Sequence, residues 1–271
     1  MMTADSVSTL ETARVEPRRA GFFHDLVSVS IRALRQIPRE PEAVIPALIV
    51  PIFFFVVQVG SLQNIAVNAG ITDYKAFQLP VAIIFAVTGI SRAGALVTDI
   101  QSGYFDRLLL TPMNRAALLL GLMIADLVLV IALSVPVVVL GYIVGVRFVT
   151  GILGILAFMG LAGLWGLAFT GFPYAIALKT GNPAAVNSSF ILFFPFAFLT
   201  TTFLPKDALT GWLATVATYN PVTYVLAGLR ALVSEGWDAS AIGGALLAIL
   251  GVAAVSFTLA FAALRGRVSR D

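Results

Sequence analysis

The chain has 271 residues, of which 59% are hydrophobic and only 11% are charged, and its formal net charge is +3 at pH 7. Soluble domains are roughly half apolar and about a quarter charged, so this composition excludes an ordinary soluble protein and indicates a polytopic membrane protein. The absence of cysteine excludes disulfides, thiolate metal sites and thiol catalysis.

Residues 1–20 hold charges of both signs and no apolar segment of the signal-peptide kind, so we expect a disordered cytoplasmic tail. Residues 22–39 predict an amphipathic helix, with charged residues at three- and four-residue spacing on one side and apolar residues on the other. Its arginines suit anionic lipid headgroups, which predicts a helix in the membrane interface; a soluble amphipathic helix is the alternative. Pro38 and Pro41 end this helix before the chain enters the bilayer.

Six apolar runs follow, each long enough to cross a hydrocarbon core of about 30 Å. They cover residues 43–60, 79–98, 116–146, 151–178, 186–204 and 241–264. We therefore expect an all-α membrane protein with six transmembrane helices, in which residues 21–271 form a single transmembrane domain. Pro136, Pro173 and Pro195 lie inside runs, where they predict helix kinks or, alternatively, substrate contacts.

The distribution of lysine and arginine predicts the orientation of these spans. With six crossings both termini lie on one side, and that side carries thirteen of the 17 basic residues. The other side carries Lys75, Arg147, Lys206 and Arg230. By the positive-inside rule both termini are cytoplasmic, and we expect a multi-pass protein of the cell (plasma) membrane that binds lipid and no nucleic acid.

Two ionisable residues, Arg92 and Asp126, lie inside apolar runs, where a charge is costly and often functional. Both fall within about two to three helical turns of the cytoplasmic ends of their runs, so snorkelling or mutual pairing would keep them hydrated. Structural pairing is one hypothesis, and a role in transport or proton relay is the other.

Signatures of enzymes are scarce. The only histidine, His24, lies in the predicted interfacial helix, so histidine-based zinc sites are excluded. The chain contains no Gly-x-Ser-x-Gly elbow and no phosphate-binding Gly-x4-Gly-Lys-Ser/Thr loop. We therefore predict no catalytic residue, no metal site and no ATPase activity of this chain alone.

Residues 99–115, here called the coupling segment, form a short amphipathic stretch between the second and third runs. Gly103 permits a tight turn, after which Tyr104, Phe105, Leu108 and Leu109 form an apolar face. Asp106 and Arg107 lie beside this face. Such a surface predicts a protein partner; a loop packed on its own helices is the alternative.

Residues 204–238, here called the external hairpin, follow the fifth run. Trp212 belongs to one apolar helical stripe, and Asn220 and Pro221 form the cap and first residue of a second helix that contains Tyr224 and Arg230. Each helix is too short to span a bilayer, which predicts a re-entrant hairpin buried against protein. A full additional span is the alternative.

The order of these elements, together with the Gly-x-x-x-Arg-Leu-Leu-x-Thr-Pro loop and the Leu-Pro…Trp-Leu…Asn-Pro-Val-Thr-Tyr…Leu-Arg-Ala-Leu segment, resembles the type 2 ATP-binding-cassette (ABC) permeases. Within them the chain looks most similar to the daunorubicin-resistance-type drug exporters. The resemblance covers roughly residues 22–265. Ile100 and Gln101 stand where a charged pair is common in the family.

The resemblance implies that the coupling segment docks on a cytosolic ABC ATPase. It assigns this role to Ser102, Gly103, Tyr104, Phe105, Asp106, Arg107 and Leu108. It also implies two ATPase copies, which bind ATP and Mg²⁺ while this chain binds no cofactor, and a second permease protomer, identical or homologous.

We expect an amphipathic, drug-like or lipid substrate, moved out of the cytoplasm by alternating access, because the candidate pathway offers aromatic and hydroxyl groups without charge. Its residues are Phe193, Phe194, Phe196, Phe198, Thr200 and Thr201. A glycolipid or polysaccharide exporter of the same family, an ATPase-independent secondary carrier and an intramembrane enzyme are the alternatives.

Overall fold

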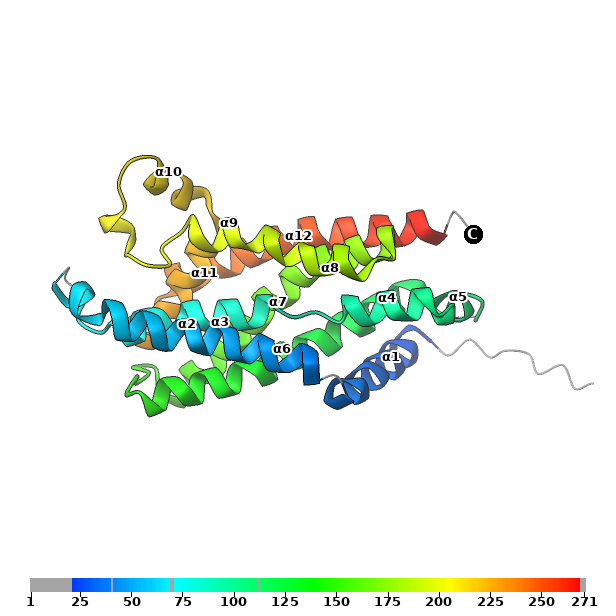
Figure 1. Ribbon diagram of the computed structural model, residues 1–271, viewed down its shortest axis with the longest axis horizontal. Helices are drawn as coiled ribbons and strands as arrows, with labels where there is room; N and C mark the ends of the chain where they lie inside the picture. Colours follow the sequence, from blue (N-terminus) through cyan, green and yellow to red (C-terminus); the bar gives the residue numbers. More distant parts are fainter. Residues whose placement is uncertain (1–20, 40, 69–70, 112, 269–271) are drawn as a thin grey trace, which may run out of the picture.

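The computed structural model describes residues 21–39, 41–68, 71–111 and 113–268, and over these residues the chain is helical without any strand. The predicted tail, residues 1–20, lies outside the described residues. The helices, shown in Figure 1, are α1 Phe22–Gln36, α2 Pro41–Asn68, α3 Tyr74–Thr88, α4 Ala93–Gln101, α5 Tyr104–Leu109, α6 Arg115–Ile143, α7 Gly151–Thr180, α8 Pro183–Ser189, α9 Phe193–Phe198, α10 Gly211–Tyr219, α11 Pro221–Arg230 and α12 Ala239–Val268.

Within the described ranges, five segments are long and apolar enough to cross a membrane. They are Val44–Val67, Tyr74–Gln101, Arg115–Ile143, Gly151–Thr180 and Ala239–Val268. The fifth predicted run instead forms the shorter segment Pro183–Phe198, in which a 3-10 turn separates α8 from α9. At 1.5 Å per residue this segment covers about 24 Å, less than the core thickness of about 30 Å. The count of six spans therefore stays a prediction that depends on this segment.

The helices differ in how far they are buried. In the apolar 18-residue stretch of α2 only 11% is buried inside the chain, whereas the corresponding share is 67% for the segment formed by α3 and α4. α2 also continues eight residues beyond the predicted end at Gly60. It lies at the edge of the chain and leaves an apolar face for lipid or for another protein to cover.

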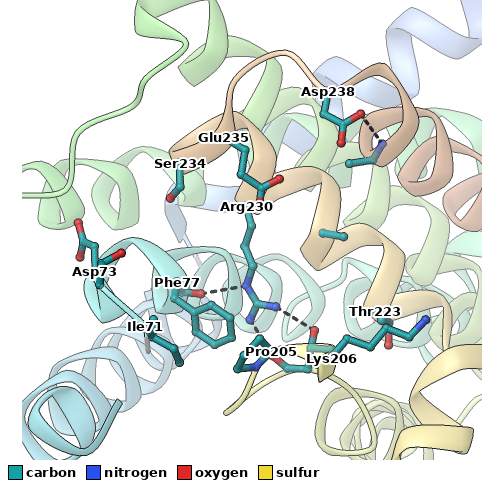
Figure 2. Close-up of a pocket in the computed structure, with 14 residues that line it drawn as sticks. Ile71, Asp73, Phe77, Pro205, Lys206, Thr223, Arg230, Ser234, Glu235 and Asp238 are labelled. Atoms are coloured by element: carbon teal, nitrogen blue, oxygen red, sulfur yellow. Dashed lines mark hydrogen bonds between the residues drawn. The ribbon is translucent and has the colours of Figure 1, made fainter. Parts of the chain in front are cut away.

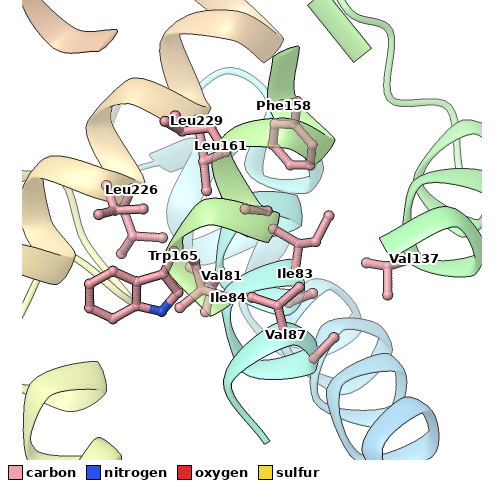
Figure 3. Packing of buried hydrophobic residues seen from close by; sticks show 14 of the residues in the cluster. Val81, Ile83, Ile84, Val87, Val137, Phe158, Leu161, Trp165, Leu226 and Leu229 are labelled. Atoms are coloured by element: carbon pink, nitrogen blue, oxygen red, sulfur yellow. The ribbon is translucent and has the colours of Figure 1, made fainter. Parts of the chain in front are cut away.

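The core joins α3, α7 and α11 through close side-chain packing. Trp165 of α7 is fully buried, and its indole N–H donates a hydrogen bond to Thr88 Oγ1 at 2.9 Å. Figure 3 shows Ile83 and Val87 of α3 and Leu226 of α11 in the same cluster. Inside a bilayer, van der Waals packing of this kind and interhelical hydrogen bonds hold helices together.

α7 and α12 approach each other closely at Gly171. A Cβ atom there would lie 2.6 Å from the backbone carbon of Ser256, so only glycine fits. The hydroxyl of Ser256 donates a hydrogen bond to the carbonyl oxygen of Ala168 at this crossing. Small residues at such contacts are typical of membrane helix pairs.

The elements gather at two opposite ends of the molecule. Figure 1 shows α1, α5 and the C-terminal end of α12 at one end and the external hairpin, with α10, at the other. The predicted cytoplasmic and external segments are therefore separated by the length of the long helices.

Candidate functional site

A sharp turn at Gly103 sets the direction of α5. Gly103 adopts the left-handed conformation with φ of 70°, which favours glycine, and α5 begins at the next residue. The hydroxyl of Ser102 donates a hydrogen bond to the carbonyl oxygen of Asp99 and closes the last turn of α4. α4 and α5 thus form one bent unit.

Phe105 faces the chain's own helices, which corrects the expected exposed face of the coupling segment. Its side chain is only 1% exposed and packs in a cluster with residues of α1, α4, α6, α7 and α12. The guanidinium of Arg267 lies 5.8 Å from its ring centroid and 4.0 Å from the carboxylate of Asp106. Helical spacing predicts that side chains share a face but does not tell whether that face points to the chain or to a partner. Phe105 therefore anchors α5.

The outward side of α5 carries other residues. Tyr104 is 38% exposed, and Asp106, Arg107 and Leu110 are also exposed. Arg32 of α1 lies 4.7 Å from the Tyr104 ring centroid and forms a 2.7 Å ion pair with Asp99. From the sequence, the arginines of α1 were expected to face lipid headgroups and Arg267 only to report orientation, because only the fold brings them to α4 and α5.

The second span is broken, and Asp126 of α6 lies at the break. α3 ends at Thr88 and α4 begins at Ala93. The backbone N–H of Arg92 donates to Asp126 Oδ1 at 2.8 Å, while the hydroxyls of Ser91 and Thr170 donate to Oδ2 at 3.1 and 2.7 Å. Arg92 and Asp126 are thus brought together through the backbone of Arg92.

The side chain of Arg92 reaches the first helix instead. Its Nη2 donates to the side-chain oxygen of Gln36 at 2.9 Å. Ser91, Thr170 and Gln36 were not predicted as site residues. A single serine or threonine inside an apolar run does not indicate a functional site in the sequence, because its hydrogen-bond partner on another helix is not known.

The external hairpin contains the two predicted short helices, α10 and α11. Asn220 caps α11, accepting the backbone N–H of Val222 at 3.0 Å, and Pro221 is the first helical residue. α11 packs on the core, but Trp212 of α10 is 70% exposed and Tyr224 is also exposed. The expectation that the hairpin buries Trp212 and Tyr224 is therefore wrong for the single chain, because α10 extends away from the core.

Two side chains tie the hairpin to the end of α9. The Asn220 amide donates to the carbonyl oxygens of Phe196 and Leu199 at 2.6 and 2.8 Å. Arg230 donates to the carbonyl oxygen of Thr201 at 2.7 Å and to that of Phe77 at 3.2 Å. The bonds to Phe196, Leu199 and Thr201 satisfy carbonyl groups in and just after α9, while the bond to Phe77 joins the hairpin to α3.

A cavity of about 570 Å³ lies beside Arg230 at the hairpin end (Figure 2). Its charged lining residues are Asp73, Glu235, Asp238, Lys206 and Arg230. The Arg230 guanidinium lies 3.5 Å from the ring centroid of Phe77, and burial lowers its pKa to about 9, so it stays charged at neutral pH. The cavity thus presents charges of both signs.

The candidate pathway residues do not form one continuous surface. Phe193 is buried, with its ring centroid 5.4 Å from that of Phe85. Thr200 and Thr201 are buried and hydrogen-bonded to Thr223 and Arg230 respectively. Of the remaining residues, Phe194 and Phe196 are exposed, and the Phe198 ring stacks against Phe203 with centroids 5.8 Å apart. The aromatic residues of α9 therefore offer a surface, whereas the two threonines are engaged internally.

Among the described residues, no group of three or more histidine, cysteine, aspartate or glutamate side chains gathers where it could hold a metal ion.

Comparison with known proteins gives consistent results along most of the chain. Residues 24–233 match the family model described as ABC-2 type transporter. The chain is 25% identical over 269 residues to the daunorubicin resistance ABC transporter permease protein DrrB1 of Streptomyces coeruleorubidus. The matched region covers 97% of this chain and 92% of that protein.

A second relative is the probable doxorubicin resistance ABC transporter permease protein DrrC of Mycobacterium tuberculosis, 25% identical over 229 residues, or 83% of this chain and 82% of that protein. A third is the putative transport permease ycf38 of Cyanophora paradoxa, 24% identical over 228 residues, or 79% and 76% of the two chains. The resemblance noted from the sequence motifs is confirmed: the chain belongs to the ABC-2 type transporter family.

Proposed function

We propose that this chain is the membrane subunit of an exporter driven by a separate ATPase, and that it moves an amphipathic, drug-like or lipid substrate out of the cytoplasm. The family and the drug-resistance names of two relatives support this function. ATP and Mg²⁺ would bind to the two ATPase subunits, and a second permease protomer would complete the pathway. Closure of the ATPases would drive rigid-body motion and alternating access.

The observation that carries the proposal is the way in which α5 is attached to the rest of the chain. Phe105 and Asp106 hold this helix to the chain's own α12, while Tyr104 and Arg107, three residues apart, point outward. Residues at this spacing lie on one face of a helix, and the exposed Leu110 follows them. A helix that packs on its own chain on one side and exposes an aromatic and a basic residue on the other is suited to receive force from a partner.

The remaining architecture of the proposal follows from orientation. We propose six spans with cytoplasmic termini, in which Pro183–Phe198 and the turn after it complete one crossing and the hairpin lies outside. α1 would lie in the membrane interface, because Phe23, Val27 and Ile31 form an exposed apolar stripe on it. The substrate would pass the exposed Phe194 and Phe196 at the contact with the second protomer.

Co-purification with the ATPase subunit tests the docking surface. The variant Tyr104→Asp replaces an aromatic group, part of which docking would cover, by a carboxylate that docking would have to desolvate, so ATPase association should weaken by about tenfold, or roughly 1.4 kcal/mol. Because Tyr104 is partly exposed, the amount of folded permease should stay near that of the unchanged protein.

Tyr142 provides a matched control at the opposite end of the molecule. It is 43% exposed, and Arg147 lies 4.7 Å from its ring centroid, the same distance as between Arg32 and Tyr104. Tyr142→Asp should leave ATPase association unchanged. Equal association of both variants with the ATPase would show that α5 is not the docking surface.

A further inference from the structure

The break in the second span lies near the middle of the segment Tyr74–Gln101. Residues 89–92 are not helical, so backbone groups that a continuous helix would pair are released at membrane depth. Irregular backbone at this depth persists only where protein or a water-filled cavity satisfies it. Here the chain itself supplies the partners.

The side chain of Asp126, which belongs to α6, lies at the N-terminal end of α4. Besides accepting the N–H of Arg92 and the hydroxyls of Ser91 and Thr170, the carboxylate lies at the positive end of the helix dipole, and its side chain is 1% exposed. Ser91 Oγ also accepts the N–H of Ala93 at 3.1 Å. In broken transporter helices such an end meets the charge of a ligand, whereas in this structure a side chain of α6 fills the position.

Both halves of the span pack on α7, but their polar ties to the rest of the chain differ. α3 is fixed to α7 by the bond between Trp165 and Thr88, and a Cβ atom on Gly166 would lie 2.9 Å from the carbonyl oxygen of Val87. The C-terminal end of α4 is tied to α1 by the ion pair between Arg32 and Asp99 and to the end of α7 by a 3.0 Å bond from Gln101 Nε2 to the carbonyl oxygen of Gly181, and α4 is followed directly by α5. The Asp126 contacts are thus the polar link between the N-terminal end of α4 and the helices α6 and α7.

We propose that residues 89–92 are a hinge, that α4 and α5 move about it as one unit, and that Asp126 is the positioning residue that holds this unit in the observed position. The inference rests on the proposed function in one respect: the force on α5 would come from the ATPase. Displacement of α5 would withdraw the N-terminus of α4 from the carboxylate, and return of α5 would restore the contact. Coupling would then depend on contacts such as the bond between Ser91 and Asp126, two residues that are 35 positions apart in the sequence.

Distances between spin labels on α4 and on α12 test the hinge. The chain has no native cysteine, so cysteines at the exposed Thr98 and Thr258 can be labelled specifically. Distances are measured by double electron–electron resonance in the permease alone and in its complex with the ATPase. In Asp126→Ala the permease alone should show a second distance population, which the unchanged protein shows only after nucleotide is added to the complex.

Two further variants separate the hinge from a general loss of stability. Thr170→Val keeps the side-chain volume, removes one donor to the same carboxylate oxygen and should shift the populations in the same direction, which covers the case that Asp126→Ala does not fold. Ser134→Ala is the control, because Ser134 is a buried residue of α6 whose hydroxyl donates to Ile131 within its own helix. It should keep the single population.

Transport provides the second readout. In Asp126→Ala the amount of substrate moved per ATP hydrolysed should fall at least about fivefold, the lower end of typical coupling effects, while the ATPase stays bound. A single unchanged distance population in Asp126→Ala and Thr170→Val, even with a lower melting temperature, would overturn the inference and leave Asp126 a static cap. Because the permease alone is measured, this result is independent of failure of the ATPase to bind, which would contradict the proposed function instead.

Discussion

Asn220 has two roles at the hairpin end, and a second asparagine in the chain has only one of them. Asn220 and Asn182 both precede a proline and both cap the helix that follows, α11 and α8. The amide of Asn220 also donates to the carbonyl oxygens of Phe196 and Leu199. The pair therefore separates capping from attachment of the hairpin to α9.

Replacement of each asparagine by alanine measures this difference. Asn182→Ala removes an exposed cap and should lower the free energy of unfolding by about 1 kcal/mol. Asn220→Ala removes a cap and leaves two carbonyl groups without their donor, so the cost should be larger by about 1–3 kcal/mol. Thermal unfolding in detergent, with hydrogen exchange along α10 and α11, measures both effects. Equal costs would show that Asn220 contributes nothing beyond its cap.

Local chemistry was predictable from the sequence at the residue scale, but contacts between distant residues were not. The dipeptide of Asn220 and Pro221 predicts a helix start because the cap depends only on neighbouring residues. The burial of Phe105 depends on a cluster of residues from several other helices, and Arg267, more than a hundred residues later in the chain, lies 5.8 Å from its ring centroid. Periodicity alone therefore assigned Phe105 to the wrong side of α5.

Apolar runs predicted most helices, but not where they are interrupted. The only proline of the run over residues 79–98 is Pro80, at its start and away from the break at 89–92, and a single glycine such as Gly89 is tolerated within helices. The break is stabilised by Asp126 from another run. The segment Pro183–Phe198 is likewise shorter than its run, because Asn220 and Arg230 pair with the chain beyond its end.

Single-cysteine labelling tests whether Pro183–Phe198 and the turn after it complete a crossing. Thr180, at the end of α7, and Thr215, in α10, are both exposed and flank this part of the chain. If it crosses, cysteine at 180 should react with a membrane-impermeant reagent only from the cytoplasmic side and cysteine at 215 only from outside. A cysteine in place of Ser102 should react from the same side as the cysteine at position 180. Labelling of 180 and 215 from the same side would reduce the count to five spans and place the C-terminus outside.

The whole molecule carries its two distinctive surfaces at opposite ends. α5 exposes Tyr104 and Arg107 at one end, and the hairpin and its charged cavity lie at the other (Figure 1). Composition and the distribution of arginine predicted the membrane class and this separation. They could not predict the substrate or what covers the surfaces that a single chain leaves exposed, such as the outer face of α2.

Substrate uptake into inside-out membrane vesicles tests the central claim most directly. Vesicles that contain the permease and its ATPase are given doxorubicin, the drug named for one relative, with ATP or with a non-hydrolysable analogue. The account predicts uptake only with ATP and both subunits, and its loss in Tyr104→Asp but not in Tyr142→Asp. Uptake by the permease alone, driven by a proton gradient without ATP, would contradict the account and identify a secondary carrier.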